Sequence, residues 1–298
     1  MTNAGDVPVA IAADARVLSL EITPRGERKP TRCELPADMR PADNLDRALV
    51  LAPGRSYTEA FEPRLYCFGE RGLGALVPGA IVVARLGWPP TSRDGTRQAV
   101  WPLEGVEPAR SSLPSLVSAP VALYDDPTPT PTAVATPSAQ DAEPANLHLR
   151  GSRSVDADSL ESISVNVTLR NDGARPVCVR FRPDTLRFEV TTSAGTARCP
   201  WPVPPSAAMR EALTTLRPGG SDTLSVLVSA YCPRQLFATP GLVVLRPELD
   251  TRKAGGEALD VRTFSGEVIA TTPVVVRLHH GTSQPRLVRP AADPPPSP

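Results

Sequence analysis

Hydrophobic and polar residues alternate along many short segments of this chain, most clearly over residues 162–170. There, Ile163, Val165, Val167 and Leu169 are separated by single polar residues. Because successive side chains of a β-strand point to opposite faces, this pattern predicts a strand with one buried face. The Asn-Asp-Gly that follows at 171–173 predicts a tight turn, since these three residues tolerate positive φ.

Comparable segments occur along the whole chain. The strands predicted from alternation and flanking turn residues are 7–11, 18–22, 55–62, 80–86 and 121–124 in the first half, and 147–150, 162–170, 177–181, 186–191, 223–229, 242–245, 257–261, 267–271 and 274–278 in the second. Only short helical turns are expected, within 43–49 and 206–213. Many short strands with almost no helix predict an all-β protein built of β-sandwiches.

The order of these segments repeats, because the chain contains one stretch twice. Residues 51–67 read LAPGRSYTEAFEPRLYC and residues 216–232 read LRPGGSDTLSVLVSAYC, with the Leu, Pro-Gly, Ser, Thr and Tyr-Cys positions shared. Four more matches follow the same order: 3–9 with 171–177, 18–22 with 186–190, 77–83 with 239–245, and 119–123 with 272–276. A period of about 165 residues indicates a duplicated domain rather than a solenoid of short repeats.

The duplication predicts two domains, residues 1–125 and 146–281, which suits a chain of 298 residues. Residues 126–145 read DPTPTPTAVATPSAQDAEPA. Alternating Pro and Thr cannot build a packed core and favour an extended path, so this segment is predicted to be a linker. The Pro-rich residues 282–298 are predicted to be a disordered tail.

The first copy begins inside the repeat, because Asn3 corresponds to Asn171 and nothing corresponds to residues 146–170. We therefore expect the first domain to lack at least one N-terminal strand, which leaves an open sheet edge and an uncovered apolar face. One explanation is that the natural chain starts upstream, with the missing strand and a signal peptide. The other is that a strand from a partner or from the second domain fills the position by β-augmentation.

The run VNVTLRNDGARPVCV at 165–179 resembles the "strand, Asn-x-Gly, x-Pro-Val, strand" signature of bacterial immunoglobulin-like modules, as do the segments 216–221 and 240–244. The resemblance covers both domains and rests on turn chemistry and alternation. It implies two tandem immunoglobulin-like β-sandwiches, the first N-terminally incomplete, that serve in adhesion, spacing or partner binding. The Cys…Trp…Cys pattern of antibody domains is absent, and the fold class alone does not select one of these roles.

Four of the five cysteines occupy corresponding places in the two copies. Cys33 and Cys67 in the first copy match Cys199 and Cys232 in the second. We predict one disulfide within each pair and an unpaired Cys178. Reduced, buried thiols are an alternative, as is a thiol or metal site, although the chain has no Cys-x-x-Cys and no zinc-type histidine spacing. Disulfides would indicate an oxidising compartment, which means the medium, the periplasm or the cell surface.

Charge and hydropathy exclude several classes of protein. The chain has 32 basic and 32 acidic residues, scattered along its length, so it lacks the basic excess typical of nucleic-acid-binding proteins. No run of about 18 apolar residues predicts a transmembrane helix. No signal peptide is visible. The apolar run at 7–13 is preceded by Asp6 and by no Lys or Arg, whereas a signal peptide begins with basic residues.

The sequence contains no motif of a known catalytic or cofactor site: GxSxG, P-loop, HExxH, EF-hand and a complete dinucleotide fingerprint are all missing. His279 and His280 are adjacent on a predicted strand and would point to opposite faces, which makes them a poor ligand pair. We therefore expect no catalytic residues, no cofactor and no metal. The leading hypothesis is a non-enzymatic, secreted or surface-attached binding, adhesion or spacer protein, whose partner is another protein or a surface glycan.

A second hypothesis is a protein inhibitor of a protease or another enzyme. The loop after Cys199 contains Trp201, Pro202, Val203 and Pro204. A loop stiffened by proline loses little conformational entropy on binding, which suits an inhibitory or partner-contact loop.

Overall fold

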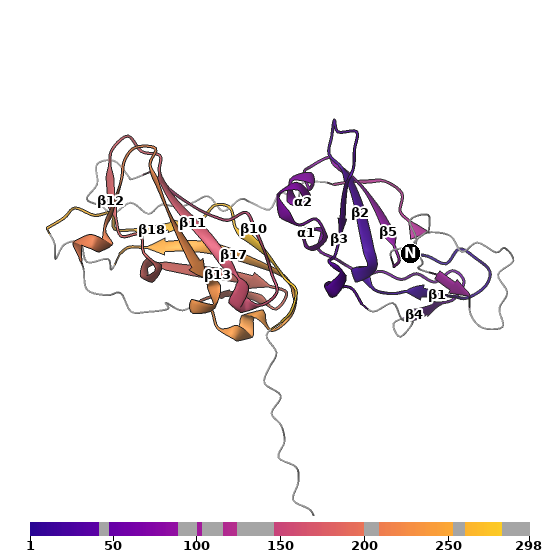
Figure 1. Ribbon diagram of the computed structural model, residues 1–298. Helices are drawn as coiled ribbons and strands as arrows, with labels where there is room; N and C mark the ends of the chain where they lie inside the picture. Colours follow the sequence, from indigo (N-terminus) through magenta and orange to yellow (C-terminus); the bar gives the residue numbers. More distant parts are fainter. Residues whose placement is uncertain are drawn as a thin grey trace, which may run out of the picture. The chain divides into compact units, whose positions relative to one another are not determined.

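The computed structural model describes residues 1–41, 48–88, 100–102, 116–123, 146–199, 209–252 and 260–281. The chain divides into two compact units, Met1–Thr132 and Ala133–Pro298, and each is described by itself below. The division falls inside the Pro/Thr-rich segment predicted to be a linker. That whole segment and the predicted tail lie outside the described residues. Mainly antiparallel sheets build both units (Figure 1), which confirms the predicted all-β class.

The described residues of the first unit form two sheets and two short α-helices. Its strands are β1 (Val9–Ala12), β2 (Leu18–Thr23), β3 (Thr31–Glu34), β4 (Ala48–Leu51), β5 (Ile81–Leu86), β6 (Val100–Pro102), β7 (Leu116–Val117) and β8 (Val121–Ala122). The strand order is β4-β1-β6 in one sheet and β3-β2-β5-β7 in the other, where β8 also pairs with β5. Helix α2 (Gly69–Ala75) packs beside β3, and α1 (Pro63–Tyr66) packs beside α2 (Figure 1).

Two predictions for the first unit are wrong. Residues 55–62 do not form a strand; only Ser56 makes an isolated bridge, to Thr2, and the chain then enters α1. The second error is α2, which was not predicted because GERGLGA contains three glycines, the poorest helix formers after proline. One of them, Gly72, is required by packing, since a Cβ there would lie 2.5 Å from the backbone carbonyl carbon of Cys67.

The described residues of the second unit form three sheets. Its strands are β9 (Leu147–Gly151), β10 (Ser154–Ala157), β11 (Ser164–Asn171), β12 (Val177–Val179), β13 (Leu186–Thr192), β14 (Gly195–Arg198), β15 (Thr214–Leu216), β16 (Ser221–Leu227), β17 (Gly241–Asp250), β18 (Glu267–Ile269) and β19 (Val274–Leu278). The orders are β10-β19-β17-β13-β14, with β18 also on β17, then β16-β11-β9 and β12-β15. The strand predicted at 257–261 falls mostly outside the described residues, and Asp260 and Val261 are not in a strand.

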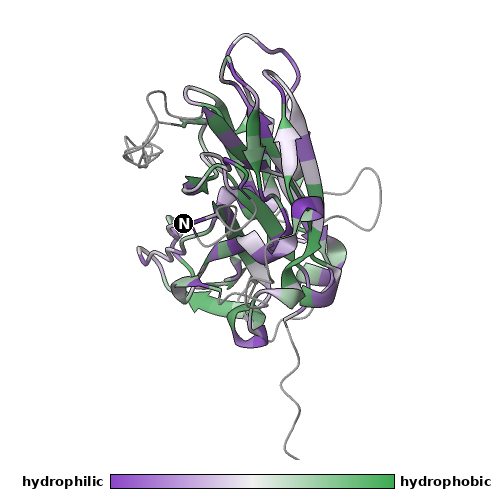
Figure 2. Ribbon diagram, turned by 90° about the vertical axis from the view of Figure 1, so that its left-hand side faces the viewer, coloured by the Kyte–Doolittle hydropathy of each residue, from purple (hydrophilic) through white to green (hydrophobic). Residues whose placement is uncertain are grey.

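The strand predicted from strict alternation is confirmed as β11, which lies between β16 and β9. Its residues Val165, Val167 and Leu169 are completely buried and belong to one continuous apolar core that spans the second unit. Hydrophobic and hydrophilic residues alternate as bands along several strands in Figure 2, as this burial pattern requires. The core of the second unit therefore depends on β11.

The first unit has two separate apolar clusters instead of one. The first gathers around Ile11 and Leu51, and the second gathers around Leu20 and the Cys33–Cys67 pair. Leu18 is only half-buried and contacts both clusters. The described residues of the first unit thus form two clusters, whereas those of the second unit form one continuous core.

Corresponding asparagines make the same hydrogen bonds in the two units. Each donates its side-chain amide to two backbone carbonyls and accepts an N–H from the glycine two positions later. Asn3 donates to Val7 and Leu51 at 2.9 Å each and accepts from Gly5 at 3.0 Å, while Asn171 donates to Arg175 and Leu216 at 2.8 and 3.0 Å and accepts from Gly173 at 2.9 Å. The sequence match at 3–9 and 171–177 thus has a matching local structure.

Corresponding tyrosines and Pro-Gly turns also match. The Tyr66 hydroxyl donates to the carbonyl oxygen of Ala15 at 2.7 Å, and that of Tyr231 donates to Pro183 at 3.1 Å. In the Pro-Gly turns, Gly54 and Gly219 have φ of 71° and 73°, and each donates its N–H at 2.8 Å to the carbonyl of the asparagine in its own unit. Positive φ explains why glycine occupies both turn positions.

Candidate functional site

The predicted partner-contact loop, at Trp201, Pro202, Val203 and Pro204, lies outside the described residues. It stays a prediction. The described residues that merit attention as a site are the disulfides, the ionic clusters of the second unit, and a groove in the first unit.

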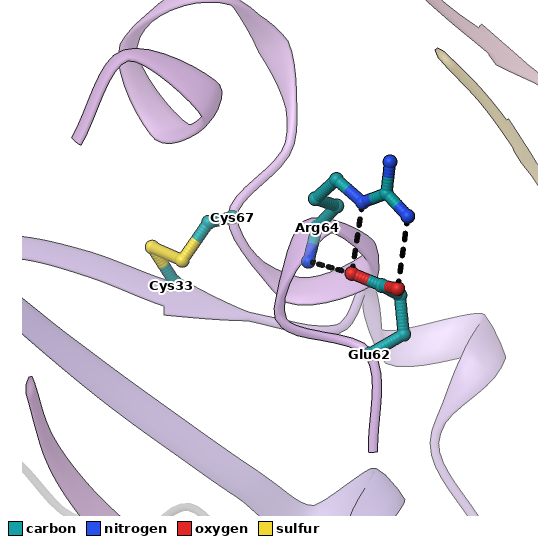
Figure 3. Close-up of a disulfide and its surroundings, with 4 residues drawn as sticks. All are labelled: Cys33, Glu62, Arg64 and Cys67. Atoms are coloured by element: carbon teal, nitrogen blue, oxygen red, sulfur yellow. Dashed lines mark hydrogen bonds and ion pairs between the residues drawn. A yellow bond between two sulfur atoms is a disulfide. The ribbon is translucent and has the colours of Figure 1, made fainter. Parts of the chain in front are cut away.

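Both predicted disulfides are present. Cys33 is bonded to Cys67 and Cys199 to Cys232, with Cα–Cα distances of 4.6 and 4.8 Å, and Cys178 is a free thiol. The first bridge ties β3 to the end of α1 (Figure 3). All four bonded cysteines are buried, so the bridges have a structural role in holding loops against each core.

Glu62 starts α1 and fixes the direction of the chain there. Its carboxylate accepts hydrogen bonds from the Arg64 backbone N–H at 3.1 Å and from its guanidinium at 2.9 and 3.0 Å (Figure 3). The hydrogen bonds from Arg64 hold the pKa of Glu62 below its usual range. The cap therefore anchors the C-terminal end of the segment 57–61, which leads into α1.

A groove of about 480 Å³ opens in the first unit. The N-terminus, β2, β5, β7 and the segment 57–61 supply its lining. Several lining side chains are apolar and exposed, with 42% of Met1, 40% of Phe61 and 44% of Val117 accessible to solvent. Leu18 and Leu86 form part of its lining as well. An exposed apolar surface of this kind marks a candidate binding site.

Polar groups at one side of the groove already have partners. The Glu59 carboxylate accepts hydrogen bonds from the backbone N–H of Ala15 at 2.8 Å and from the Tyr57 hydroxyl at 2.7 Å. Asp14 forms an ion pair with Arg16 at 2.7 Å. The groove therefore presents apolar side chains next to carboxylates that make hydrogen bonds within the unit.

The groove borders the segment of the first unit that matches β16 in the sequence repeat. The bridge between Thr2 and Ser56 corresponds, through the repeat, to the rung between Arg170 and Ser221 at the end of the β11–β16 ladder. In the second unit this ladder continues along all of β16. In the first unit the corresponding segment, 57–61, borders the groove instead.

Ionic clusters cover parts of the second unit. Arg187 donates to the buried Glu248 carboxylate at 2.7 Å and also bonds Glu267. Asp156 accepts hydrogen bonds from the Arg277 Nε at 3.0 Å and pairs with His279 at 2.7 Å. Burial acts to raise the pKa of Asp156, but the bonds from Arg277 and His279 keep it below its usual range. These pairs link neighbouring strands and account for the charged residues structurally.

None of the residues that line the groove was among the site residues predicted from the sequence. The related signal was the missing counterpart of residues 146–170, which predicts an open sheet edge and an uncovered apolar face in the first domain. What the sequence could not supply is the lining contributed by β2, β5 and β7, since those strands come together only through the sheet topology.

Metal-binding clusters, membrane-spanning helices and similar proteins were also sought. Among the described residues, no group of three or more His, Cys, Asp and Glu side chains is placed to hold a metal ion. None of the helices in this part of the chain is long and apolar enough to cross a membrane. No protein-family model matches the chain, and no curated protein is similar to it in sequence, so the functional interpretation rests on the geometry.

Proposed function

We propose that this chain is a non-enzymatic protein of the cell exterior or periplasm, in which two tandem immunoglobulin-like β-sandwiches bind or space other molecules. The location is supported by the two disulfides, because such bonds persist in oxidising compartments. The partner class that suits an exposed apolar groove is another protein.

The proposal includes an origin of both units by duplication. The matched asparagine and tyrosine hydrogen bonds support it, and so does the pairing of the strands. Leu20 lies opposite Cys33 in the β2–β3 pair, and at the corresponding place Cys199 donates its backbone N–H to Phe188 at 2.9 Å. A common ancestor predicts matching hydrogen bonds of this kind and the matching register of the β2–β3 pair.

The groove of the first unit is the observation on which the binding role rests. The second unit fills the corresponding position with β11 and has a continuous core. We assign it the role of a folded spacer, while the first unit provides the contact surface. The inhibitory loop at 201–204 remains an alternative contact surface that the described residues do not address.

The test is a binding experiment with the full chain, produced under conditions that form disulfides and tagged only at its C-terminus. Crosslinking to a cell-surface fraction of the source organism would identify partners, and titration with each purified partner would measure affinity. The proposal expects saturable binding that leaves the partner chemically unchanged. Conversion of the partner into a product, or no saturable binding to any purified surface component, would overturn it.

A further inference from the structure

We propose that the groove of the first unit accepts one extended strand of a partner polypeptide, with aliphatic side chains at alternate positions. The strand would lie antiparallel to residues 58–61. This inference rests on the binding role proposed above and specifies the chemistry of the partner.

The backbone of the first unit already begins the ladder that such a strand would continue. Thr2 bridges to Ser56, and the next residues, Met1 and Tyr57, exchange two N–H to C=O hydrogen bonds of 2.8 Å each. These pairs correspond to the first two of the seven β11–β16 pairs in the second unit. Among the described residues no strand pairs with 58–61, so a strand added there would extend the short ladder that Thr2–Ser56 and Met1–Tyr57 begin, in the manner of β-augmentation.

The apolar lining defines which side chains the strand would insert. In the second unit, Val165 and Val167 of β11 are fully buried, as are Leu186 and Leu249 in the same core. Leu18 pairs with Leu86 in the first unit as Leu186 pairs with Leu249 in the second, and both Leu18 and Leu86 line the groove. Aliphatic residues at every second position would fill the groove and join the two separate clusters of this unit.

One difference from the second unit is compatible with this occupant. Glu59 stands where β16 has Leu224. Its carboxylate already accepts hydrogen bonds from the Ala15 N–H and the Tyr57 hydroxyl. The charge therefore has partners within the unit before a strand arrives, which lowers the cost of covering it.

The chain's own best matching strand is not available for this position. β11 is held on both sides, by β16 and by β9, and its side chains form the core of the second unit. Its transfer to the first unit, in the same or a second copy, would dismantle that core. We therefore assign the site to a strand of a partner polypeptide and not to β11.

The experiment uses a fluorescent peptide with the sequence ESISVNVT, which copies residues 161–168, and the full chain without any N-terminal addition. Anisotropy should show saturable binding, and hydrogen exchange should slow at the amides of 58–61. A permuted peptide has the same composition but places its aliphatic residues next to one another. Its affinity should be lower by about tenfold or more, because alternate side chains would no longer face the groove.

Variants locate the binding. Val117→Asp and Phe61→Asp, both in the groove, should each weaken peptide binding about tenfold or more, since each puts a charge into an apolar contact. Val121→Asp is the matched control, because Val121 is 58% exposed on β8 and does not line the groove. Thermal unfolding of each variant checks its fold, and Val117→Asp provides the decisive measurement if Phe61→Asp unfolds.

Lack of peptide binding, exchange protection elsewhere than 58–61, or equal weakening by Val121→Asp would overturn the inference. The partner identified by crosslinking separates this failure from failure of the proposed function. If that partner binds equally well to Val117→Asp, the binding role stands and the strand site is wrong. If no partner binds the unaltered chain, the proposed function itself is wrong.

Discussion

The hydroxyl of Tyr231 donates a hydrogen bond to the carbonyl oxygen of Pro183, 48 positions earlier in the chain, at 3.1 Å. The ring is almost completely buried and stacks edge-on against Phe188 at 5.2 Å. Burial, aided by the nearby Asp184 charge, raises the pKa of Tyr231 to about 12. The hydroxyl thus stays protonated, and remains a donor, well beyond the range of an exposed tyrosine.

This pKa predicts how stability depends on alkaline pH. A tyrosine whose pKa is higher in the folded state contributes stability that is complete below the unfolded pKa and is lost as the pH rises toward the folded pKa. The free energy of unfolding should therefore fall by about 2–3 kcal/mol between about pH 10 and pH 12 from this residue. Denaturant unfolding at several pH values checks it.

Tyr231→Phe should remove much of that alkaline fall and cost about 1 kcal/mol at neutral pH through the lost hydrogen bond. Tyr57→Phe is the control, since Tyr57 is partly exposed. An unchanged alkaline slope in Tyr231→Phe would contradict the assignment.

The disulfide of the second unit should be a major source of its stability. It closes a loop with a sequence separation of 33, and the chain-entropy model gives about 3–4 kcal/mol for a loop of this size. Replacing both Cys199 and Cys232 by Ser should lower the free energy of unfolding by about that amount. Cys178→Ser, which removes only the free thiol, is the matched control; a comparable loss there would argue against the disulfide as the cause.

The asparagine turns predict unequal effects in the two units. Asn171 is completely buried and donates to two carbonyls, so Asn171→Ala should destabilise the second unit by about 2–4 kcal/mol by leaving polar groups without partners. Asn3 makes the same bonds but is partly exposed, and water can replace them. Asn3→Ala should therefore cost less in chemical denaturation. A larger loss for Asn3→Ala than for Asn171→Ala would contradict this explanation.

The glycines of α2 provide a matched pair for packing. A Cβ at Gly72 would meet the backbone of Cys67, whereas nothing lies within 4 Å of one at Gly74. Gly72→Ala should destabilise the first unit by about 1–3 kcal/mol through overpacking. Gly74→Ala should stabilise it by about 0.5–1 kcal/mol because alanine favours the helix. Thermal unfolding of the full chain measures the stability of both variants. Stabilisation by Gly72→Ala would show that the contact with the Cys67 backbone does not require glycine at this position.

The sequence predicted structure best where a regular pattern of residues reflects burial or pairing in the fold. β11 was predictable because its alternation is strict, and the disulfides were predictable because the repeat pairs the four cysteines. Short edge strands such as β3 and β14 have no alternation long enough to detect. They exist because a neighbouring strand pairs with them, which no local pattern records.

Residues 55–62 show the limit most directly. Ser56 and Thr58 match Ser221 and Thr223 of β16, yet β16 is a strand and residues 55–62 are not. The register of the strand pairs β2–β5 and β13–β17 could not be predicted from the repeat either. The Pro-Gly matches align Val82 with Val244, but Ile22 pairs with Val82 whereas Val190, its counterpart, pairs with Leu245. The matching Pro-Gly turns thus lead into strands that are offset by one residue.

The bridge between Thr2 and Ser56 allows the effect of a neighbouring strand to be compared between two segments of the same chain. One polypeptide contains two copies of a strand-forming stretch, one with a neighbour along its length and one with a neighbour for its first two residues. Temperature, ionic strength and denaturant act on both copies in the same tube. A ratio of amide exchange rates at 58–61 to those at 223–226 would therefore cancel solvent effects, leaving mainly the contribution of an adjacent strand and the differences between the two sequences.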